Sequence, residues 1–171
     1  MQTMKNLRFR CVIIICAIYS TMNAQYLTEN KNVIAEFKVM DARDNGEDIS
    51  PQIILEYGRL IIYKSELNNQ IMLSNFWEKS LSQSYGPIKF LSKEITPKSN
   101  DAFEKENLTF NWEYTNTYDT INGIAKIEIV IKYKPQGKYF ELTIISEDLK
   151  PSVYKGEMIG NLRELDFYLK K

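Results

Sequence analysis

The side chains that could carry out chemistry in this 171-residue chain are carboxylates, lysines, tyrosines and serines. The sequence contains no histidine, and its two cysteines, Cys11 and Cys16, lie in an apolar run near the N-terminus. Serine and cysteine nucleophiles are normally activated by histidine, and zinc is normally held by imidazole or thiolate. The composition therefore excludes Ser-His-Asp and Cys-His catalysis and zinc sites of that kind, and no catalytic residue is predicted.

Three carboxylates in strand-like segments could serve as a glycosidase pair: Glu113, Glu128 and Glu141. Such hydrolysis needs two carboxyl groups at a defined separation, one of them with a raised pKa. All three fall on the polar side of their segments with lysines predicted opposite two of them, which favours a solvated ladder of ion pairs. The acidic segment 41–51 could gather oxygen ligands for calcium, but it lacks the spacing of an EF-hand. We predict no metal site and no cofactor.

Aromatic residues form the most informative set, because five of them are predicted to share one face of neighbouring strands. In a closed barrel that face points inward, where aromatic side chains either fill the core or line a cavity. Asn116 is predicted to lie on the same face, opposite Ile129, where its amide could orient a ligand or could mark a bulge. The five aromatic residues are Trp112, Tyr114, Tyr118, Tyr133 and Phe140. The predicted ligand-lining residues are Trp112, Tyr114, Asn116 and Tyr133.

A first predicted hairpin positions part of this set. Residues 124–134 alternate apolar and polar side chains, which is the period-two pattern of a half-buried strand. A tight turn at Gln136-Gly137 would place Tyr133 opposite Phe140 and would also bring lysines opposite glutamates on the outer face. The pattern therefore predicts an antiparallel pair with an apolar inner face.

A second predicted hairpin precedes the first. A turn at Asn122-Gly123, the strongest short hairpin signal, would place Trp112 opposite Tyr133. A slip of one residue in either hairpin would turn every apolar side chain to water. The agreement of the two registers predicts a three-stranded meander between Asn107 and Met158.

The rest of the chain alternates strand-like segments with turns. About eight sequential strands predict an all-β fold in a single domain over 33–171, either an up-and-down barrel or a β-sandwich. The long meander strands favour the barrel. Asn45-Gly46 is expected to form a turn and Gly58 a bulge or bend, while residues 160–171 fit a strand better than a helix. The other predicted strands are 33–40, 53–64, 71–77, 88–95 and 153–159.

The predicted architecture resembles that of the lipocalin and fatty-acid-binding families. Lipocalins carry Gly-x-Trp on their first strand, and residues 33–40 contain neither Gly nor Trp, so no lipocalin residue is carried over. Residues 82–86 and 110–126 are similar to small uncharacterised secreted β-proteins of Bacteroidetes, a likeness that implies no known activity. Asp119-Thr120-Ile121 resembles the motif at which Bacteroidetes attach O-glycans, so Thr120 is a candidate glycosylation site.

The N-terminus has the features of a secretory signal peptide. Three basic residues precede the apolar run 11–19, which is far shorter than the roughly 20 residues of a membrane-spanning helix, and Ala24 marks the expected cleavage site. We predict a signal peptide over 1–24 and a flexible lead-in over 25–32. The ending Asn23-Ala24-Gln25 resembles the signal peptides of Bacteroidetes, which implies a periplasmic or cell-surface protein. The alternative is a lipoprotein anchored at Cys16.

Removal of the signal peptide would leave 19 basic residues against 22 acidic ones, a net charge of −3, and no cysteine. Nucleic acids and anionic membranes require a concentrated basic surface, so neither is a predicted partner. Without disulfides the mature chain must fold by core burial, for which a domain of this size is sufficient.

These observations lead to three functional hypotheses. The first is a non-enzymatic binding protein that holds a small, largely apolar ligand inside a β-barrel. The alternative is a cell-surface module that binds a protein or a glycan through loops such as 41–51 and 78–86. The third, and least favoured, is a carboxylate-dependent hydrolase.

Overall fold

The described residues of the computed structural model are 32–99, 103–147 and 149–165. The predicted signal peptide, its cleavage site at Ala24, the alternative anchor Cys16 and nearly all of the lead-in lie outside the described residues. The end of the chain, from residue 166 onward, lies outside them as well.

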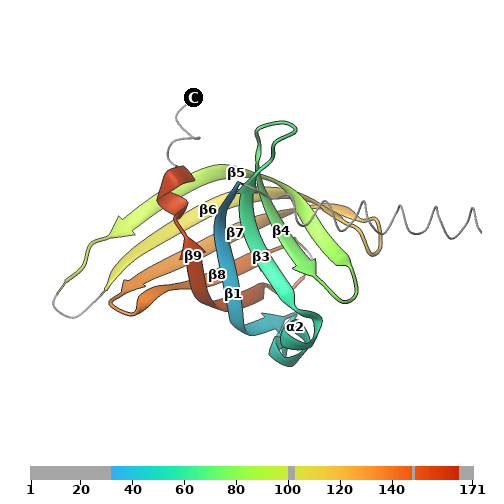
Figure 1. The fold of residues 1–171 in the computed structure, drawn as a ribbon, viewed down its shortest axis with the longest axis horizontal. Coiled ribbons are helices and arrows are strands. Elements are labelled where there is room, and N and C mark those ends of the chain that lie inside the picture. Colours follow the sequence, from blue (N-terminus) through green and yellow to red (C-terminus); the bar gives the residue numbers. More distant parts are fainter. Residues whose placement is uncertain (1–31, 100–102, 148, 166–171) are drawn as a thin grey trace, which may run out of the picture. The chain divides into compact units, whose positions relative to one another are not determined.

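Eight antiparallel strands close into one barrel (Figure 1). Each barrel strand pairs with the next one along the chain, and the ring closes because the first strand also pairs with the last. The prediction of an all-β up-and-down barrel is confirmed, and the sandwich alternative is not adopted. The barrel strands are β1 (Val33–Asp44), β3 (Gly58–Lys64), β4 (Ile71–Trp77), β5 (Ser82–Thr96), β6 (Glu104–Asn116), β7 (Asn122–Lys134), β8 (Gly137–Ile145) and β9 (Ser152–Gly160), and the short β2 (Glu47–Asp48) pairs with β1 beside the ring.

Alternation along the strands decides which side chains fill the barrel. On β7 the inward positions Ala125, Ile127 and Ile129 are buried, while the side chains between them are more exposed. Phe37 of β1 meets Phe140 of β8 edge to face, with ring centroids 4.8 Å apart. These residues belong to one continuous apolar cluster, in which each large side chain stabilises the fold by about 1.5–3 kcal/mol.

The barrel has two ends, which carry different elements (Figure 1). Because successive strands run in opposite directions, alternate connections meet at the same end. The α2 end carries the helix α2 (Ser50–Glu56) and the β4–β5, β6–β7 and β8–β9 connections. The η1 end carries the β3–β4, β5–β6 and β7–β8 connections and the 3-10 helix η1 (Leu162–Leu165).

Helix α2 replaces part of a predicted strand. Residues 53–64 were expected to be extended, but Ser50–Glu56 form a helix and β3 begins only at Gly58. Tyr57 ends the helix in the left-handed region, with a φ of +52°. Ile53 is the buried residue of the helix and packs against the Gly58 backbone, where a Cβ would lie 2.9 Å from its Cγ2. The expected bend at Gly58 is therefore the junction between helix and strand.

The two ends of the domain also differ from the predicted segments. β1 extends four residues beyond the predicted strand 33–40, and Asn45-Gly46 forms the expected turn with positive φ at both residues. The tail was predicted to be a strand, but η1 is helical from Leu162 to Leu165. Both leucines are buried at the η1 end, and three-residue spacing points them to the same side of a 3-10 helix.

The β7–β8 hairpin keeps the predicted faces but not the predicted register. Lys134 pairs with Gly137, so the turn is Pro135-Gln136, one position earlier than predicted, and Tyr133 does not lie opposite Phe140. Proline has no N–H to donate to a ladder, so it fits best in the turn itself. The register differs by two residues, and an even shift leaves every side chain on its predicted face.

The β6–β7 hairpin departs further from prediction. The turn predicted at Asn122-Gly123 is wrong, because these residues pair within the ladder, opposite Thr115 and Tyr114. The connection is residues 117–121, closed by a 2.8 Å hydrogen bond from the N–H of Asn116, the last residue of β6, to the Ile121 carbonyl oxygen. The register differs by eight residues, again an even number, so the predicted inner face of the meander is kept.

Candidate functional site

Trp112 lies on the inward face of β6 near the α2 end, opposite Ala125 and not Tyr133. Its side chain is 2% exposed, and its ring centroid lies 4.8 Å from that of Tyr114. The indole Nε1–H has no hydrogen-bond acceptor among the described residues. A buried donor without a partner costs about 1–3 kcal/mol, so the interior favours an incoming acceptor at this position.

Tyr114 lies two residues closer to the α2 end and is half-buried. A Cβ on Gly123, the residue opposite, would be 2.5 Å from the Tyr114 hydroxyl oxygen, so the tyrosine ring rests on a position that only glycine can fill without displacing it. Tyr114 also borders an open depression of about 420 Å³. The other residues lining this depression are Pro87, Glu113, Thr115, Asn122, Gly123 and Ile124.

Asn116 is the last residue of β6 and does not lie opposite Ile129 as predicted. Its side-chain oxygen accepts a 2.8 Å hydrogen bond from the Tyr118 N–H, so the amide helps to hold the β6–β7 loop. Tyr118 was predicted to face inward and is instead 81% exposed in this loop. Thr120 is exposed beside it, with a φ of +58° and its hydroxyl donating to the Asp119 carbonyl oxygen at 2.7 Å. Its glycosylation stays a prediction.

Tyr133 belongs to a polar cluster at the η1 end. Its hydroxyl donates a 2.9 Å hydrogen bond to Oε2 of Glu106, whose side chain is completely buried on the inward face of β6. Arg163 of η1 donates from Nε to the other oxygen of Glu106 at 2.5 Å and also contacts Glu104. The Arg163 guanidinium lies 4.6 Å from the centroid of the Tyr133 ring. This cluster ties η1 to the barrel wall.

Burial and charge shift the pKa values in this cluster. Desolvation raises the pKa of Tyr133 to about 12, helped by its hydrogen bond to Glu106 and by the charge of that carboxylate. The hydrogen bond to Glu106 raises the pKa of Arg163, and the burial of its guanidinium acts in the opposite direction. Tyr133 therefore stays a neutral donor and Arg163 a cation throughout the physiological pH range.

The structure thus separates the four predicted lining residues. Trp112, Tyr114 and Asn116 lie toward the α2 end, while Tyr133 lies at the η1 end with a carboxylate and a guanidinium around it. The sequence reasoning missed Glu106, because the predicted meander begins only at Asn107. The signal was available, since Glu106 continues the inward alternation of Leu108, Phe110 and Trp112.

The carboxylates considered for hydrolysis are either exposed or paired with a lysine. Glu113 is exposed, Glu128 pairs with Lys126 of its own strand at 2.6 Å, and Glu141 pairs with Lys155 of β9 at 3.1 Å. Within the described ranges, no group of three or more acidic, histidine or cysteine side chains is placed to hold a metal ion. The buried Glu106 is already bound by Arg163.

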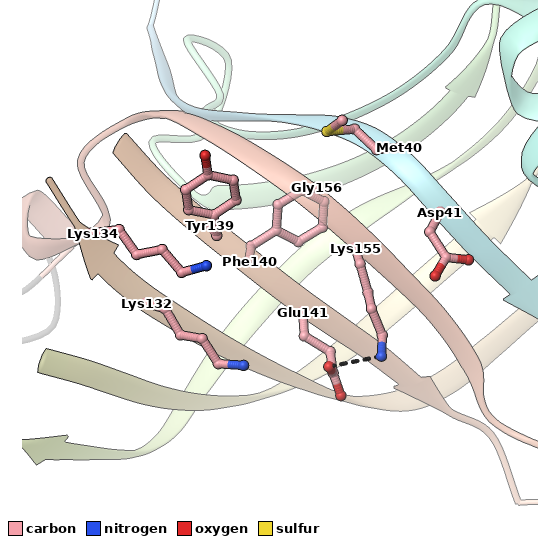
Figure 2. A pocket seen from close by; sticks show the side chains of 9 residues that line it. All are labelled: Met40, Asp41, Lys132, Lys134, Tyr139, Phe140, Glu141, Lys155 and Gly156. Carbon is pink, nitrogen blue, oxygen red and sulfur yellow. Dashed lines mark ion pairs between the residues drawn. The ribbon is translucent and has the colours of Figure 1, made fainter. Parts of the chain in front are cut away.

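An open groove of about 240 Å³, called the outer groove, crosses the outside of the barrel over β7, β8, β9 and β1 (Figure 2). It combines an aromatic ring, three lysines and two carboxylates on one surface. Lys134 lies over the Tyr139 ring, with its Nζ 4.6 Å from the centroid. The lining residues are Met40, Asp41, Lys132, Lys134, Tyr139, Phe140, Glu141, Lys155 and Gly156.

Comparison of the chain with family models, with curated proteins and with solved structures finds no match in any of the three. In the part of the chain that the structure describes, no helix is both long and apolar enough to cross a membrane. The case for a function therefore depends on the geometry of the barrel.

Proposed function

We propose that this protein is a secreted, non-enzymatic binding protein that takes a small, largely apolar ligand into the α2 end of its barrel. The observation that carries the proposal is the indole Nε1–H of Trp112, a buried donor without an acceptor among the described residues. A ligand with an apolar body and one acceptor atom would satisfy that donor and would keep its surroundings apolar.

The residues around Trp112 support this location. Ala125 lies directly opposite Trp112. The other buried inward residues of β7 are isoleucines, so Ala125 has the smallest side chain of this row. Tyr114, two residues nearer the α2 end, has its ring beside that of Trp112 and is supported by Gly123. A ligand that enters at the α2 end would therefore meet the Tyr114 ring before it reaches Trp112.

The remaining parts of the proposal come from the sequence. Secretion depends on the signal peptide expected over 1–24, with an anchor at Cys16 as the alternative. Relationship to the small secreted proteins of Bacteroidetes and glycosylation at Thr120 are likewise proposals. Non-enzymatic binding agrees with the absence of histidine from the whole sequence and with the pairing of Glu128 and Glu141 with lysines.

Native mass spectrometry tests for a retained ligand. Mature protein purified gently from its source should show a mass excess in the folded state that disappears on denaturation. A folded mass equal to the denatured mass, in protein that has also been incubated with a panel of apolar compounds, would contradict the interior ligand.

Trp112→Phe tests the role of the indole donor. Removal of the N–H should weaken retention of the ligand by about tenfold, the value of one buried hydrogen bond, while the free energy of unfolding changes little. Trp77→Phe is the matched control, because Trp77 is the other tryptophan and also packs against the core. Equal retention by both variants would contradict the assignment.

A second candidate function is a surface module that binds another macromolecule at the α2 end. The observation that favours it is the exposure of Ile54, Leu55 and Tyr57, at 61–64%, beside Leu81 of the β4–β5 turn. The turn lies against α2, since its Lys79 ammonium is 5.0 Å from the centroid of the Tyr57 ring. Contiguous exposed apolar side chains commonly mark interaction surfaces.

Crosslinking on intact cells distinguishes this second candidate. A photo-crosslinker at position 55 should give a discrete complex that is lost when Leu81 is replaced by serine. A crosslinker in place of Leu67, an exposed leucine at the η1 end, is the control. The same complexes from both positions would count against a specific surface at the α2 end.

A further inference from the structure

The outer groove depends on a local irregularity in the barrel wall. Met40 forms a β-bulge in β1, because the register against β9 shifts between Val39 and Asp41. Gly156 lies against this bulge, and a Cβ there would be 2.0 Å from the Lys38 carbonyl oxygen. Bulges bend a strand and redirect its side chains, and they are frequent beside functional sites.

Three lysines lie on or beside one side of the groove. Lys132 and Lys134 line it from β7, both on the same side of Tyr139 in the view of Figure 2. Lys105 of β6 is directly opposite Lys132 in the ladder. None of these three lysines forms an ion pair with another described residue.

This arrangement of lysines lowers the stability of the sheet. Like charges directly opposite each other on neighbouring strands destabilise a sheet, as Lys105 and Lys132 do here. On the other side of the groove, Lys155 is neutralised by Glu141 at 3.1 Å, and Asp41 lies beyond them (Figure 2). Glu157 lies opposite Tyr139 in the ladder, so the three lysines of β6 and β7 outnumber the carboxylate directly beside Tyr139, and an anion bound there would relieve the repulsion between Lys105 and Lys132.

We propose that the outer groove is a binding site for an acidic sugar: the anionic group draws Lys134 off the Tyr139 ring to pair with it together with Lys132, and the sugar ring then lies against Tyr139 and Met40. Lysine ammonium groups bind carboxylate and sulfate, and a tyrosine ring with an exposed thioether beside it provides apolar surface for a flat body. Met40 is 59% exposed and therefore accessible. The site is independent of the interior ligand proposed above, because it lies on the outer face of the barrel wall.

The size of the groove limits what part of a ligand it holds. Pockets for drug-sized molecules measure about 300–1,000 Å³, and the outer groove, at about 240 Å³, fits one ring-sized unit. An acidic sugar could arrive as a free monosaccharide or as one residue of a glycan chain. The chemistry recognised is the same in both cases, and the two sources are separated by the test.

Titration of uniformly labelled protein, followed by NMR, tests the site with three probes: glucuronate, an oligogalacturonate and neutral maltotetraose. The acidic probes should shift resonances of β7, β8 and the Met40 bulge, and the neutral sugar should not. Tighter binding of the oligosaccharide identifies a glycan as the source, and equal binding identifies the monosaccharide. Binding should weaken at high salt, because exposed charges are screened.

Charge-removing variants decide whether the groove is responsible. Lys132→Gln and Lys134→Gln should each weaken binding of the acidic probes by about fivefold, the usual upper limit for an exposed ion pair. Lys89→Gln and Lys150→Gln are the controls, because each removes the same single charge from an exposed position outside the groove. Tyr139→Ala should weaken binding and Tyr139→Phe should not, with the unfolding midpoint measured to confirm that each variant folds.

Three results would overturn the proposal. The first is no shift with either acidic probe. The second is an equal loss of binding in the control variants and in the groove variants, which would indicate a general effect of net charge. The third is binding of inorganic sulfate as tightly as of the acidic sugars, because the ring would then contribute nothing. The Trp112→Phe variant should bind all three probes as the natural protein does, which separates this test from that of the interior ligand.

Discussion

The two ends of the barrel differ in whether their buried polar groups have hydrogen-bond partners. At the η1 end, the buried Glu106 carboxylate is matched by the Tyr133 hydroxyl and by the Arg163 guanidinium. Toward the α2 end, the buried Trp112 donor is matched by no described group. A polar cluster in which every group is hydrogen-bonded holds η1 against the barrel. An unpaired donor can instead form a hydrogen bond with a ligand.

This difference between the two ends predicts that substitutions at one end will mainly affect stability and substitutions at the other will mainly affect binding. Breaking the cluster at the η1 end should cost stability, because a charge would be left buried without its partner. Removing the donor near the α2 end should cost binding and little stability. Variants at the two ends therefore test whether one end governs stability and the other governs binding.

Arg163→Ala should have the largest effect. It leaves the fully buried Glu106 without its cation, at a cost of about 3 kcal/mol in the free energy of unfolding, the lower part of the range for buried pairs because Arg163 itself is 45% exposed. Urea denaturation measures this cost. The double variant Glu106→Leu, Arg163→Leu should recover most of it, and a loss below about 1 kcal/mol in the single variant would show that the cluster does not anchor η1.

Tyr133→Phe and Trp112→Phe compare the two ends directly. Tyr133→Phe removes a hydroxyl that is bonded to a carboxylate and should destabilise the protein by about 1.5–2 kcal/mol. Trp112→Phe should change stability by less than about 1 kcal/mol, since relief of the unpaired donor offsets the lost apolar area. Chemical denaturation gives both values, and the reverse order would contradict the comparison.

Gly123→Ala should act on the wall of the predicted binding region. The added Cβ would meet the Tyr114 hydroxyl, and displacement of this half-buried ring should cost about 1 kcal/mol in the free energy of unfolding. Because Tyr114 shields Trp112, hydrogen exchange of the Trp112 indole should become faster. Unchanged exchange would show that Tyr114 does not control access.

A further effect is expected only at alkaline pH, where one tyrosine near each end titrates late. Burial raises the pKa of Tyr133 to about 12, and burial with the charge of Asp44 raises that of Tyr154 to about 12. A folded pKa above the unfolded value of about 10 stabilises the fold fully below pH 10, and that contribution is lost as the pH rises toward 12. Ultraviolet titration should show one fewer late-titrating tyrosine in Tyr133→Phe and in Tyr154→Phe.

Much of the fold follows from the sequence because side-chain alternation is insensitive to even shifts of register. The faces of β6, β7 and β8 were predicted correctly although both turns were misplaced. Asn122-Gly123 resembles a two-residue turn, but Asn116 and Asp119 supply side-chain oxygens that hold a longer loop. Local turn propensity was outweighed by these hydrogen bonds and by the packing of Tyr114 on Gly123.

Other features could not be predicted from local sequence, because they depend on contacts between distant parts of the chain. The segment 53–56 is rich in isoleucine and leucine and suits either a strand or a helix, and only its docking on Gly58 decides between them. The burial of Glu106 depends on Arg163, 57 residues further along the chain. The prediction that Trp112 is buried on the inner face is confirmed, but its unpaired donor and the outer groove appear only in three dimensions.

The most direct test of the account is the nitrogen–proton spectrum of the tryptophan indoles. The sequence has two tryptophans, so two signals are expected, and Trp112→Phe assigns them. In gently purified protein, the Trp112 indole proton should resonate further downfield than in protein stripped by denaturation and refolding, because only the former supplies an acceptor. Identical Trp112 signals in the two preparations, together with no added mass, would contradict a ligand at the α2 end.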